Sequence, residues 1–282
     1  MNSLLAPAIV CSLLLVGCGQ ANQSSQISAE EAELSSESTI AAPSNITVSA
    51  AASLTDAMED IKVVYQQQQP ETNIIYNFAS SGSLQQQIEQ GAPVDVFVSA
   101  ASKQMNELEA KQLLKQDTRK NLLENRLVLI VSTNIENISK FEDLKSDRIN
   151  KIAIGEPGSV PAGKYAREVF DNLKIADRLE SKTIFAKNVR QVLTYVETEN
   201  VDAGIVYATD AKKSTRVEIA AVAPKASHSP IVYPVAVVED TRNSEASEDF
   251  VEFLSSNSAG KVFEKHGFAL TEESANTALT AK

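Results

Sequence analysis

A serine at the start of an expected helix is the first feature of this sequence that could do chemistry. Residues 46–50 read as a short strand, and from Leu54 apolar residues recur at helical spacing. Ser53 stands between the two segments, and Asp56 follows three residues later, which is a capping-box pattern. The first N–H groups of a helix have no partner within it and carry a partial positive charge, so this turn could bind an anion. The same pattern also serves a helix that only caps itself, so one such turn does not establish a site.

The unit of strand, small polar turn and helix recurs about five times along the chain. In open α/β sheets, ligands bind beyond the carboxyl ends of the strands, where helices begin. The recurring turns fall in both halves of the sequence. They predict a cleft between two domains that binds an anion through hydrogen bonds alone. The positions expected at these strand ends and helix starts are Ser53, Ser81, Ala162, Val189 and Tyr207.

Apolar periodicity places the elements that must position these turns. Alternating strands and helices predict an α/β fold of two domains, each a mostly parallel sheet flanked by helices. We place a domain crossing near Asn125, which gives domain 1 as residues 45–125 plus 232–282 and domain 2 as residues 126–231. Strands are expected over 46–50, 73–78, 94–99, 127–131, 151–155, 183–185, 202–207, 217–223 and 231–239. Helices are expected from 54 and over 84–90, 103–114, 161–173, 189–197, 244–254 and 259–265. Asn188 is a good N-cap for the helix over 189–197, and Pro161 suits the first turn of the helix over 161–173.

Length and charge set limits on function. The 282 residues are enough for two modest α/β domains or one large one. The formal net charge of −11 argues against nucleic acid as a partner. The same charge would be an odd balance for anion binding unless the site itself is locally positive or neutral.

The N-terminus reads as an export signal. Residues 4–16 are apolar but too few to span a membrane as a mature helix. They lead into Cys18 in a sequence, LVGC, that resembles the lipobox of bacterial lipoproteins, in which cleavage precedes a lipid-carrying cysteine. The first three residues lack Lys and Arg, and a plain signal peptide with an incidental cysteine is the alternative. We expect a signal peptide over 1–17 and a disordered, lipid-attached linker over 18–44. The other cysteine, Cys11, lies in the removed segment, so no disulfide is expected.

Enzyme motifs are weak in this sequence. Residues 158–164 (GSVPAGK) imitate a phosphate-binding loop, but Tyr165 stands where Ser or Thr would hold magnesium, and Pro161 lacks an N–H group. No G-x-S-x-G motif occurs, and the two histidines, His228 and His266, do not make a catalytic or metal-binding set. We therefore expect a binding protein. An exported hydrolase and a purely structural lipoprotein remain alternatives.

Seven motifs in order resemble those of the periplasmic molybdate-binding proteins of ABC importers, which have the type II periplasmic binding protein fold. The similarity extends from about Ile46 to Phe268, and Gly82 and Ala208 are mild departures from the family pattern. The motifs are residues 50–58 (AAASLTDAM), 78–84 (FASSGSL), 91–97 (GAPVDVF), 160–166 (VPAGKYA), 188–190 (NVR), 204–207 (GIVY) and 233–238 (YPVAVV).

The resemblance implies the ligand and the role of each site residue. Ser53 and Ser81 would supply hydroxyl and backbone donors from domain 1, Ala162 and Val189 backbone N–H groups from domain 2, and Tyr207 its phenolic hydroxyl. The ligand would be molybdate or tungstate, held without a cofactor or a free metal cation. The protein would be a monomer in the periplasm or at the cell surface, lipid-anchored through Cys18, and would deliver the ion to an importer permease and its ATPase. A binding protein for sulfate or another oxyanion is the nearest alternative.

Overall fold

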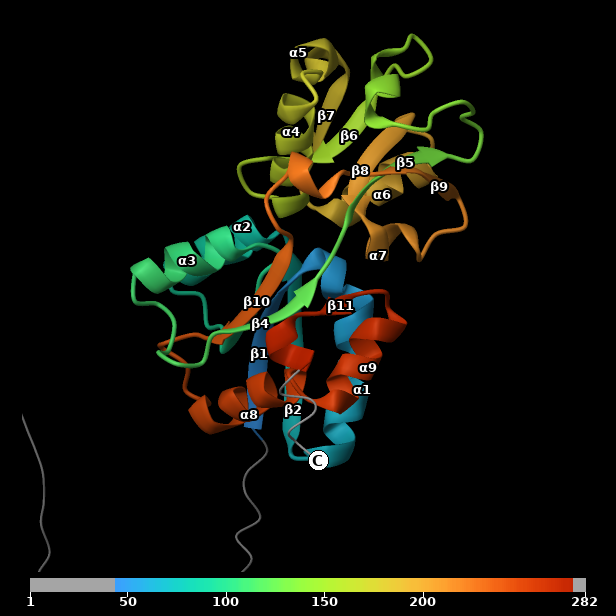
Figure 1. Ribbon diagram of the computed structural model, residues 1–282. Coiled ribbons are helices and arrows are strands. Elements are labelled where there is room, and N and C mark those ends of the chain that lie inside the picture. Colours follow the sequence, from blue (N-terminus) through green and yellow to red (C-terminus); the bar gives the residue numbers. More distant parts are fainter. Residues whose placement is uncertain (1–43, 276–282) are drawn as a thin grey trace, which may run out of the picture. The chain divides into compact units, whose positions relative to one another are not determined.

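Two mixed β-sheets, each flanked by helices, make up the part of the chain that the structure describes, residues 44–275. The structure is a computed structural model (Figure 1). The expected signal peptide over 1–17, nearly all of the linker over 18–44 and the lipidation site Cys18 lie outside the described residues. Among the described helices, none is long and apolar enough to cross a membrane.

The first sheet has six strands in the order β11-β4-β10-β3-β1-β2. We call this sheet and its helices lobe 1. Its strands are β1 (Ser44–Ala51), β2 (Thr72–Ala79), β3 (Val96–Val98), β4 (Lys120–Glu124), β10 (Val232–Val237) and β11 (Ala269–Leu270). Its helices are α1 (Thr55–Gln68), α2 (Ser81–Glu89), α3 (Ser102–Ala110), α8 (Ser244–Leu254) and α9 (Asn257–Lys265).

The second sheet has five strands in the order β7-β6-β8-β5-β9, and with its helices it forms lobe 2. Its strands are β5 (Leu127–Ser132), β6 (Ile152–Gly155), β7 (Thr183–Ala186), β8 (Ala203–Tyr207) and β9 (Val217–Val222). Its helices are α4 (Pro161–Asn172), α5 (Ala176–Leu179), α6 (Val189–Glu197) and α7 (Ala208–Ala211). Short 3-10 turns lie at Ala52–Leu54, Phe141–Lys145, Glu180–Lys182 and Lys225–Ser227.

The expected α/β fold of two sheets flanked by helices is confirmed, and within it both sheets are mixed instead of mostly parallel. β1 pairs in parallel with β2 and β3, but β10 runs antiparallel to both β3 and β4. In lobe 2, β6 is parallel to β7 and β8, whereas β5 is antiparallel to β8 and β9. The strands that run against the others are β5 in lobe 2 and β10 and β11 in lobe 1. β5 and β10 are the first strands after the two places where the chain passes between the lobes.

Helices pack on both faces of the first sheet, and apolar side chains of its strands contact them on each face. Phe97 of β3 packs with α2 and α3, while its neighbours Val96 and Val98 belong to the larger core that includes α1, α8 and α9. Successive side chains of a strand point to opposite faces of the sheet, so Val96 and Val98 lie on the face opposite to that of Phe97. β5 is buried along its whole length, which accounts for its uninterrupted apolar sequence.

The bounds of several elements differ from expectation, and the short elements α5, α7 and β11 were not predicted. α2 begins at Ser81, three residues earlier than expected, and α3 ends at Ala110 rather than at residue 114. β4 was not predicted, because its sequence begins with polar residues and only Leu122 and Leu123 are buried. The start at Pro161 of α4 and the cap at Asn188 of α6 were predicted and are confirmed.

Candidate functional site

All five residues expected at a binding site line one pocket between the two lobes. Ser53 and Ser81 belong to lobe 1, and Ala162, Val189 and Tyr207 belong to lobe 2. All five are buried. The rest of the lining is small or apolar, apart from Ser80 and Asn188: Ala51, Ala52, Ala79, Ala100, Val160 and Pro161.

Ser53 does not cap its helix, contrary to the capping-box prediction. The chain leaves β1 through a 3-10 turn over Ala52–Leu54, and α1 begins only at Thr55 with no side-chain cap. The Ser53 hydroxyl instead lies 3.0 Å from the hydroxyl oxygen of Tyr233, with either group able to donate. The side chain is therefore turned from its own helix toward the pocket and β10.

Ser81 is the first residue of α2, and Ser80 caps the helix by accepting a hydrogen bond from the Ser83 N–H group. The Ser81 oxygen accepts a hydrogen bond of 2.9 Å from the backbone N–H of Ala100. A serine hydroxyl has one proton to donate besides its acceptor capacity. With its oxygen already accepting, Ser81 has its proton available to a group in the pocket.

Lobe 2 presents the starts of two helices to the pocket. Ala162 follows Pro161 in the first turn of α4, and Val189 is the first residue of α6. The Asn188 side chain caps α6 by accepting a hydrogen bond of 2.9 Å from the Gln191 N–H. N–H groups at these first positions have no acceptor within their own helix and point out of its N-terminal end. Two backbone donors can thus face the pocket from lobe 2.

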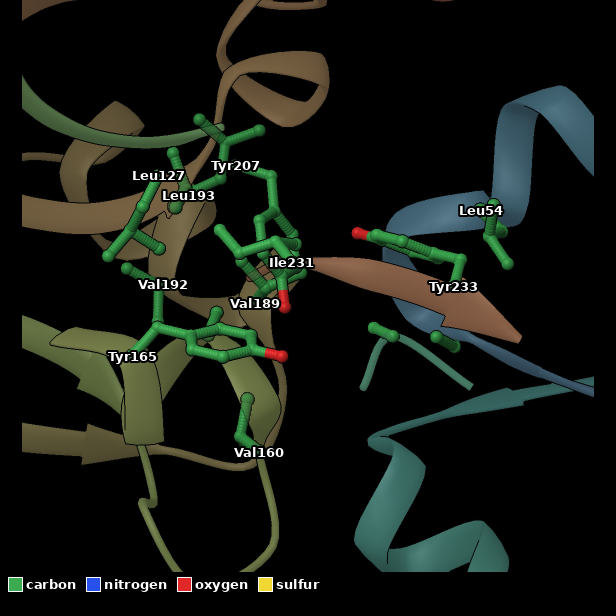
Figure 2. Packing of buried hydrophobic residues seen from close by; sticks show 14 of the residues in the cluster. Leu54, Leu127, Val160, Tyr165, Val189, Val192, Leu193, Tyr207, Ile231 and Tyr233 are labelled. Carbon is green, nitrogen blue, oxygen red and sulfur yellow. The ribbon is translucent and has the colours of Figure 1, made fainter. Parts of the chain in front are cut away.

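Tyr207 ends β8, and its hydroxyl is buried without a hydrogen-bond partner among the described residues. Its ring lies edge-on to that of Tyr233, with 5.7 Å between centroids. Figure 2 shows Tyr165 and Tyr233 on opposite sides of the space between the lobes, with their hydroxyl groups directed toward it. Burial raises the pKa of both Tyr207 and Tyr233 well above the usual value, so both hydroxyls keep their protons. An unpartnered buried donor of this kind is costly unless a ligand satisfies it.

The charge beside the pocket is locally balanced. Arg190, next to Val189, pairs with Asp56 of lobe 1 and, at 3.0 Å, with Asp210 of lobe 2. Partial burial raises the pKa of Asp56, but Arg190 outweighs that effect and leaves it below the usual range. Asp210 is fully buried, and loss of solvation raises its pKa to about 7 although Arg190 acts in the opposite direction. This local balance lets a site exist in a protein whose total charge is −11.

The residues that line this pocket include neither a histidine nor a cluster of metal-binding side chains. His266 lies between Lys213 and Asp60, and His228 contacts the carbonyl oxygen of Ser229, so neither lines the pocket. Among residues 44–275, no group of three or more His, Cys, Asp or Glu residues is placed to hold a metal ion. Pro161 opens α4 in the segment that imitates a phosphate-binding loop, so that loop has one N–H group fewer.

Sequence reasoning missed the supporting residues of the pocket. Tyr233 was noted only as part of a motif, yet its hydroxyl contacts Ser53 and accepts a hydrogen bond of 3.3 Å from the side-chain amide of Asn125. The polar residues next to predicted site residues, Ser80 and Asn188, also line the pocket. Their position at helix N-caps was the signal that could have identified them.

A family model decides the relationship of this chain to known proteins. Residues 46–269 match the model of the bacterial extracellular solute-binding proteins. The chain belongs to this family. The solute-binding protein therefore has the two-lobed fold that the sequence resemblance implied, and its family consists of binding proteins rather than enzymes.

Individual relatives cover most of the solute-binding protein. YvgL of Bacillus subtilis, named as an ABC transporter substrate-binding lipoprotein, is 42% identical over 94% of this chain and 97% of its own. The molybdate-binding protein ModA of Haemophilus influenzae is 41% identical over 81% of this chain and 91% of its own. The solved periplasmic molybdate-binding protein of Azotobacter vinelandii has a TM-score of 0.73 at 21% identity, covers 80% of this chain and matches over its entire length. At that identity the solved structure shows a shared fold.

Proposed function

We propose that this solute-binding protein captures molybdate, and also tungstate, between its two lobes and delivers the ion to an ABC importer. The observation that carries the proposal is the buried Tyr207 hydroxyl, which has no hydrogen-bond partner among the described residues and lines a pocket with Ser53 and Ser81. The name of the Haemophilus influenzae relative, 41% identical, supports molybdate as the ion.

The pocket offers donors from both lobes. In the proposal, the hydroxyls of Ser53, Ser81 and Tyr207 and the backbone N–H groups of Ala162 and Val189 each donate to an oxygen of the ion. Hydrogen bonds to a charged group contribute about 1.5–3 kcal/mol each. Five of them, less the costs of association and ordering, support dissociation constants of roughly micromolar to nanomolar.

A pocket whose ligand-binding groups are all hydrogen-bond donors distinguishes oxyanions by their protonation state as well as by their size. Molybdate is an unprotonated tetrahedral dianion at neutral pH, so it can accept from every donor. Hydrogen phosphate carries a proton that needs an acceptor, and leaving that proton unpaired costs about 1–3 kcal/mol. Sulfate has the same charge as molybdate but shorter bonds, so its oxygens would not reach all donors at once. Tungstate is nearly the size of molybdate and should be accepted.

The two links between the sheets are the natural place for the lobes to bend. β4 ends at Glu124 and β5 begins at Leu127, while β9 ends at Val222 and β10 begins at Val232. The Asn125 N–H donates to the Ile231 carbonyl at 3.2 Å, so the two links are joined where they pass each other. We infer that residues 45–125 plus 232–282 and residues 126–231 move as two domains, and that closure buries the ion and marks the loaded form for the importer.

The location of the protein follows in part from its family, whose members act outside the cytoplasm. The finer proposal is that Cys18 carries lipid after removal of residues 1–17, and that residues 18–44 tether a monomer to the membrane. The Bacillus subtilis relative named as a lipoprotein supports this, because its match covers 94% of this chain. Mass spectrometry of the N-terminal peptide would detect a lipid on Cys18, and an unmodified cysteine after the cleavage would contradict the anchor.

The experiment that tests the ligand is calorimetric titration of the purified, ion-free protein with molybdate, tungstate, sulfate and phosphate. We expect one-to-one binding of molybdate and tungstate, with sulfate and phosphate weaker by about tenfold or more, as the loss of one hydrogen bond to a charged ligand predicts. Tight sulfate binding would identify sulfate as the ligand in place of molybdate and would leave the proposed role in import unchanged. Absence of heat with all four ions would contradict the proposed function.

A further inference from the structure

Arg190 connects the two lobes beside the pocket. It is the second residue of α6 in lobe 2, and its guanidinium contacts Asp56 in the first turn of α1 in lobe 1. The same guanidinium lies 3.0 Å from Asp210 of α7. The Arg190 side chain is 27% exposed and Asp210 is completely buried, so the ion pair with Asp210 is largely shielded from solvent. Shielded charge pairs of this kind are screened less by salt than surface pairs.

Each member of this triad follows a residue of the proposed binding site. Asp56 lies three residues after Ser53, Arg190 follows Val189 directly, and Asp210 lies three residues after Tyr207. Because α1, α6 and α7 begin at these places, one guanidinium joins the N-terminal turns of three helices. A change in the separation of the lobes must therefore move Asp56 away from Arg190 and Val189 away from Ser53 together.

Arg190 is paired with two carboxylates and does not line the pocket. Two carboxyl groups, Asp56 and Asp210, share its charge. An arginine has a planar set of donors that suits two partners at once, which a lysine ammonium does not. Among the residues that line the pocket there is no Lys or Arg. Its contacts therefore suit it to hold the lobes together rather than to bind the ion.

The charged contacts between the lobes extend beyond Arg190. Lys213, just after α7, lies 4.0 Å from Asp56 and 2.6 Å from the Nδ1 atom of His266 in lobe 1. The Gly82 N–H group also donates to the Ser159 carbonyl at 2.9 Å, which is a backbone contact between the lobes. The protection of the Gly82 N–H group thus reports whether the lobes are together.

We propose that Arg190 is a positioning residue that latches lobe 2 to lobe 1 through Asp56 and slows release of the bound oxyanion. The latch contact is a property of the lobes themselves, whereas its effect on ion release rests on the proposed function. Asp210 holds the guanidinium from within lobe 2, and Asp56 completes the latch when the lobes meet. Ion capture and lobe closure are coupled because the same helix starts carry both sets of contacts.

The variant Asp56→Asn removes the negative charge from the cross-lobe pairs that Asp56 makes with Arg190 and Lys213, and Asp56 is 42% exposed, so the fold should tolerate it. Arg190→Lys keeps the charge but cannot serve both carboxylates with the same geometry. The matched control is Asp171→Asn, which removes a carboxylate from the Arg167–Asp171 pair within α4, 3.3 Å long and confined to lobe 2. The readouts are the molybdate dissociation rate, from the change in tyrosine fluorescence, and hydrogen exchange of the Gly82 amide with and without molybdate.

We expect Asp56→Asn and Arg190→Lys to raise the molybdate dissociation rate about threefold to tenfold, with a smaller change in the association rate. Exchange of the Gly82 amide should accelerate in both variants, whereas exchange of core amides such as that of Val48 and all readouts of Asp171→Asn should match the parent protein. Unchanged Gly82 exchange in both variants would overturn the latch, whatever the ion. If the parent protein does not bind molybdate, the proposed function fails, and faster Gly82 exchange in the variants without ligand would still support the latch.

Discussion

Replacing Tyr207 with phenylalanine should stabilise the ligand-free protein and weaken ion binding at the same time. The Tyr207 hydroxyl is buried with no hydrogen-bond partner among the described residues, so its removal relieves a desolvation cost of about 1–3 kcal/mol. For a chain of this size, 1 kcal/mol corresponds to a shift of about 2–4 °C in melting temperature. With molybdate present, the loss of one hydrogen bond to a charged ligand should weaken binding roughly 10- to 150-fold.

Thermal melts without ion and titrations with molybdate measure the two effects separately. Tyr76→Phe is the matched control, because the Tyr76 hydroxyl donates to the Met58 carbonyl at 2.8 Å and Tyr76 does not line the pocket. That variant should lose stability and keep its affinity. A lower melting temperature for ion-free Tyr207→Phe, or an affinity equal to that of the parent protein, would refute the reasoning about the Tyr207 hydroxyl.

Two further substitutions test the charge and the packing around the pocket. Asp210 has a pKa of about 7 in the folded protein and about 3.8 when unfolded, so the folded state holds a proton that the unfolded state lacks between these values. Its contribution to stability is fully present below about pH 4 and is lost as the pH rises to 7, by up to about 4 kcal/mol. Asp210→Asn should therefore flatten the decline in stability between about pH 4 and pH 7 in denaturant titrations, and an unchanged slope would contradict the assignment. A Cβ atom on Gly163 would lie 1.9 Å from the Gly155 carbonyl oxygen, so Gly163→Ala should displace the start of α4. It should weaken molybdate binding more than tenfold in calorimetry, whereas Gly158→Ala, whose Cβ would meet no atom closer than a Glu156 carboxylate oxygen at 4.0 Å, should not.

Local sequence signals predicted the helix starts that surround the pocket. Asn188 is the N-cap of α6 and Pro161 is the first residue of α4, as expected. Both preferences depend only on the backbone of the adjoining helical turn, so the local sequence is enough to predict them. The family was also predicted from short motifs, and the family model confirms it. The site residues meet at one pocket, and their contact with an ion stays a prediction.

Tertiary contacts account for what the sequence could not predict. Ser53 matched a capping box, but Tyr233, 180 residues away, offers its hydroxyl a partner outside the helix. The sequence of β4 has no clear apolar period. Its strand structure depends on its pairing with β10 and β11, which are distant in the sequence. The contact of Arg190 with Asp56 joins residues 134 positions apart, so no local pattern could indicate it.

Diffraction from crystals grown with molybdate, recorded at the molybdenum absorption edge, would locate the bound ion. We expect one strong anomalous peak between the lobes, with oxygens within hydrogen-bond distance of the hydroxyls of Ser53, Ser81 and Tyr207 and of the N–H groups of Ala162 and Val189. A peak elsewhere, or an ion held by a lysine or arginine side chain in place of these donors, would contradict this expectation.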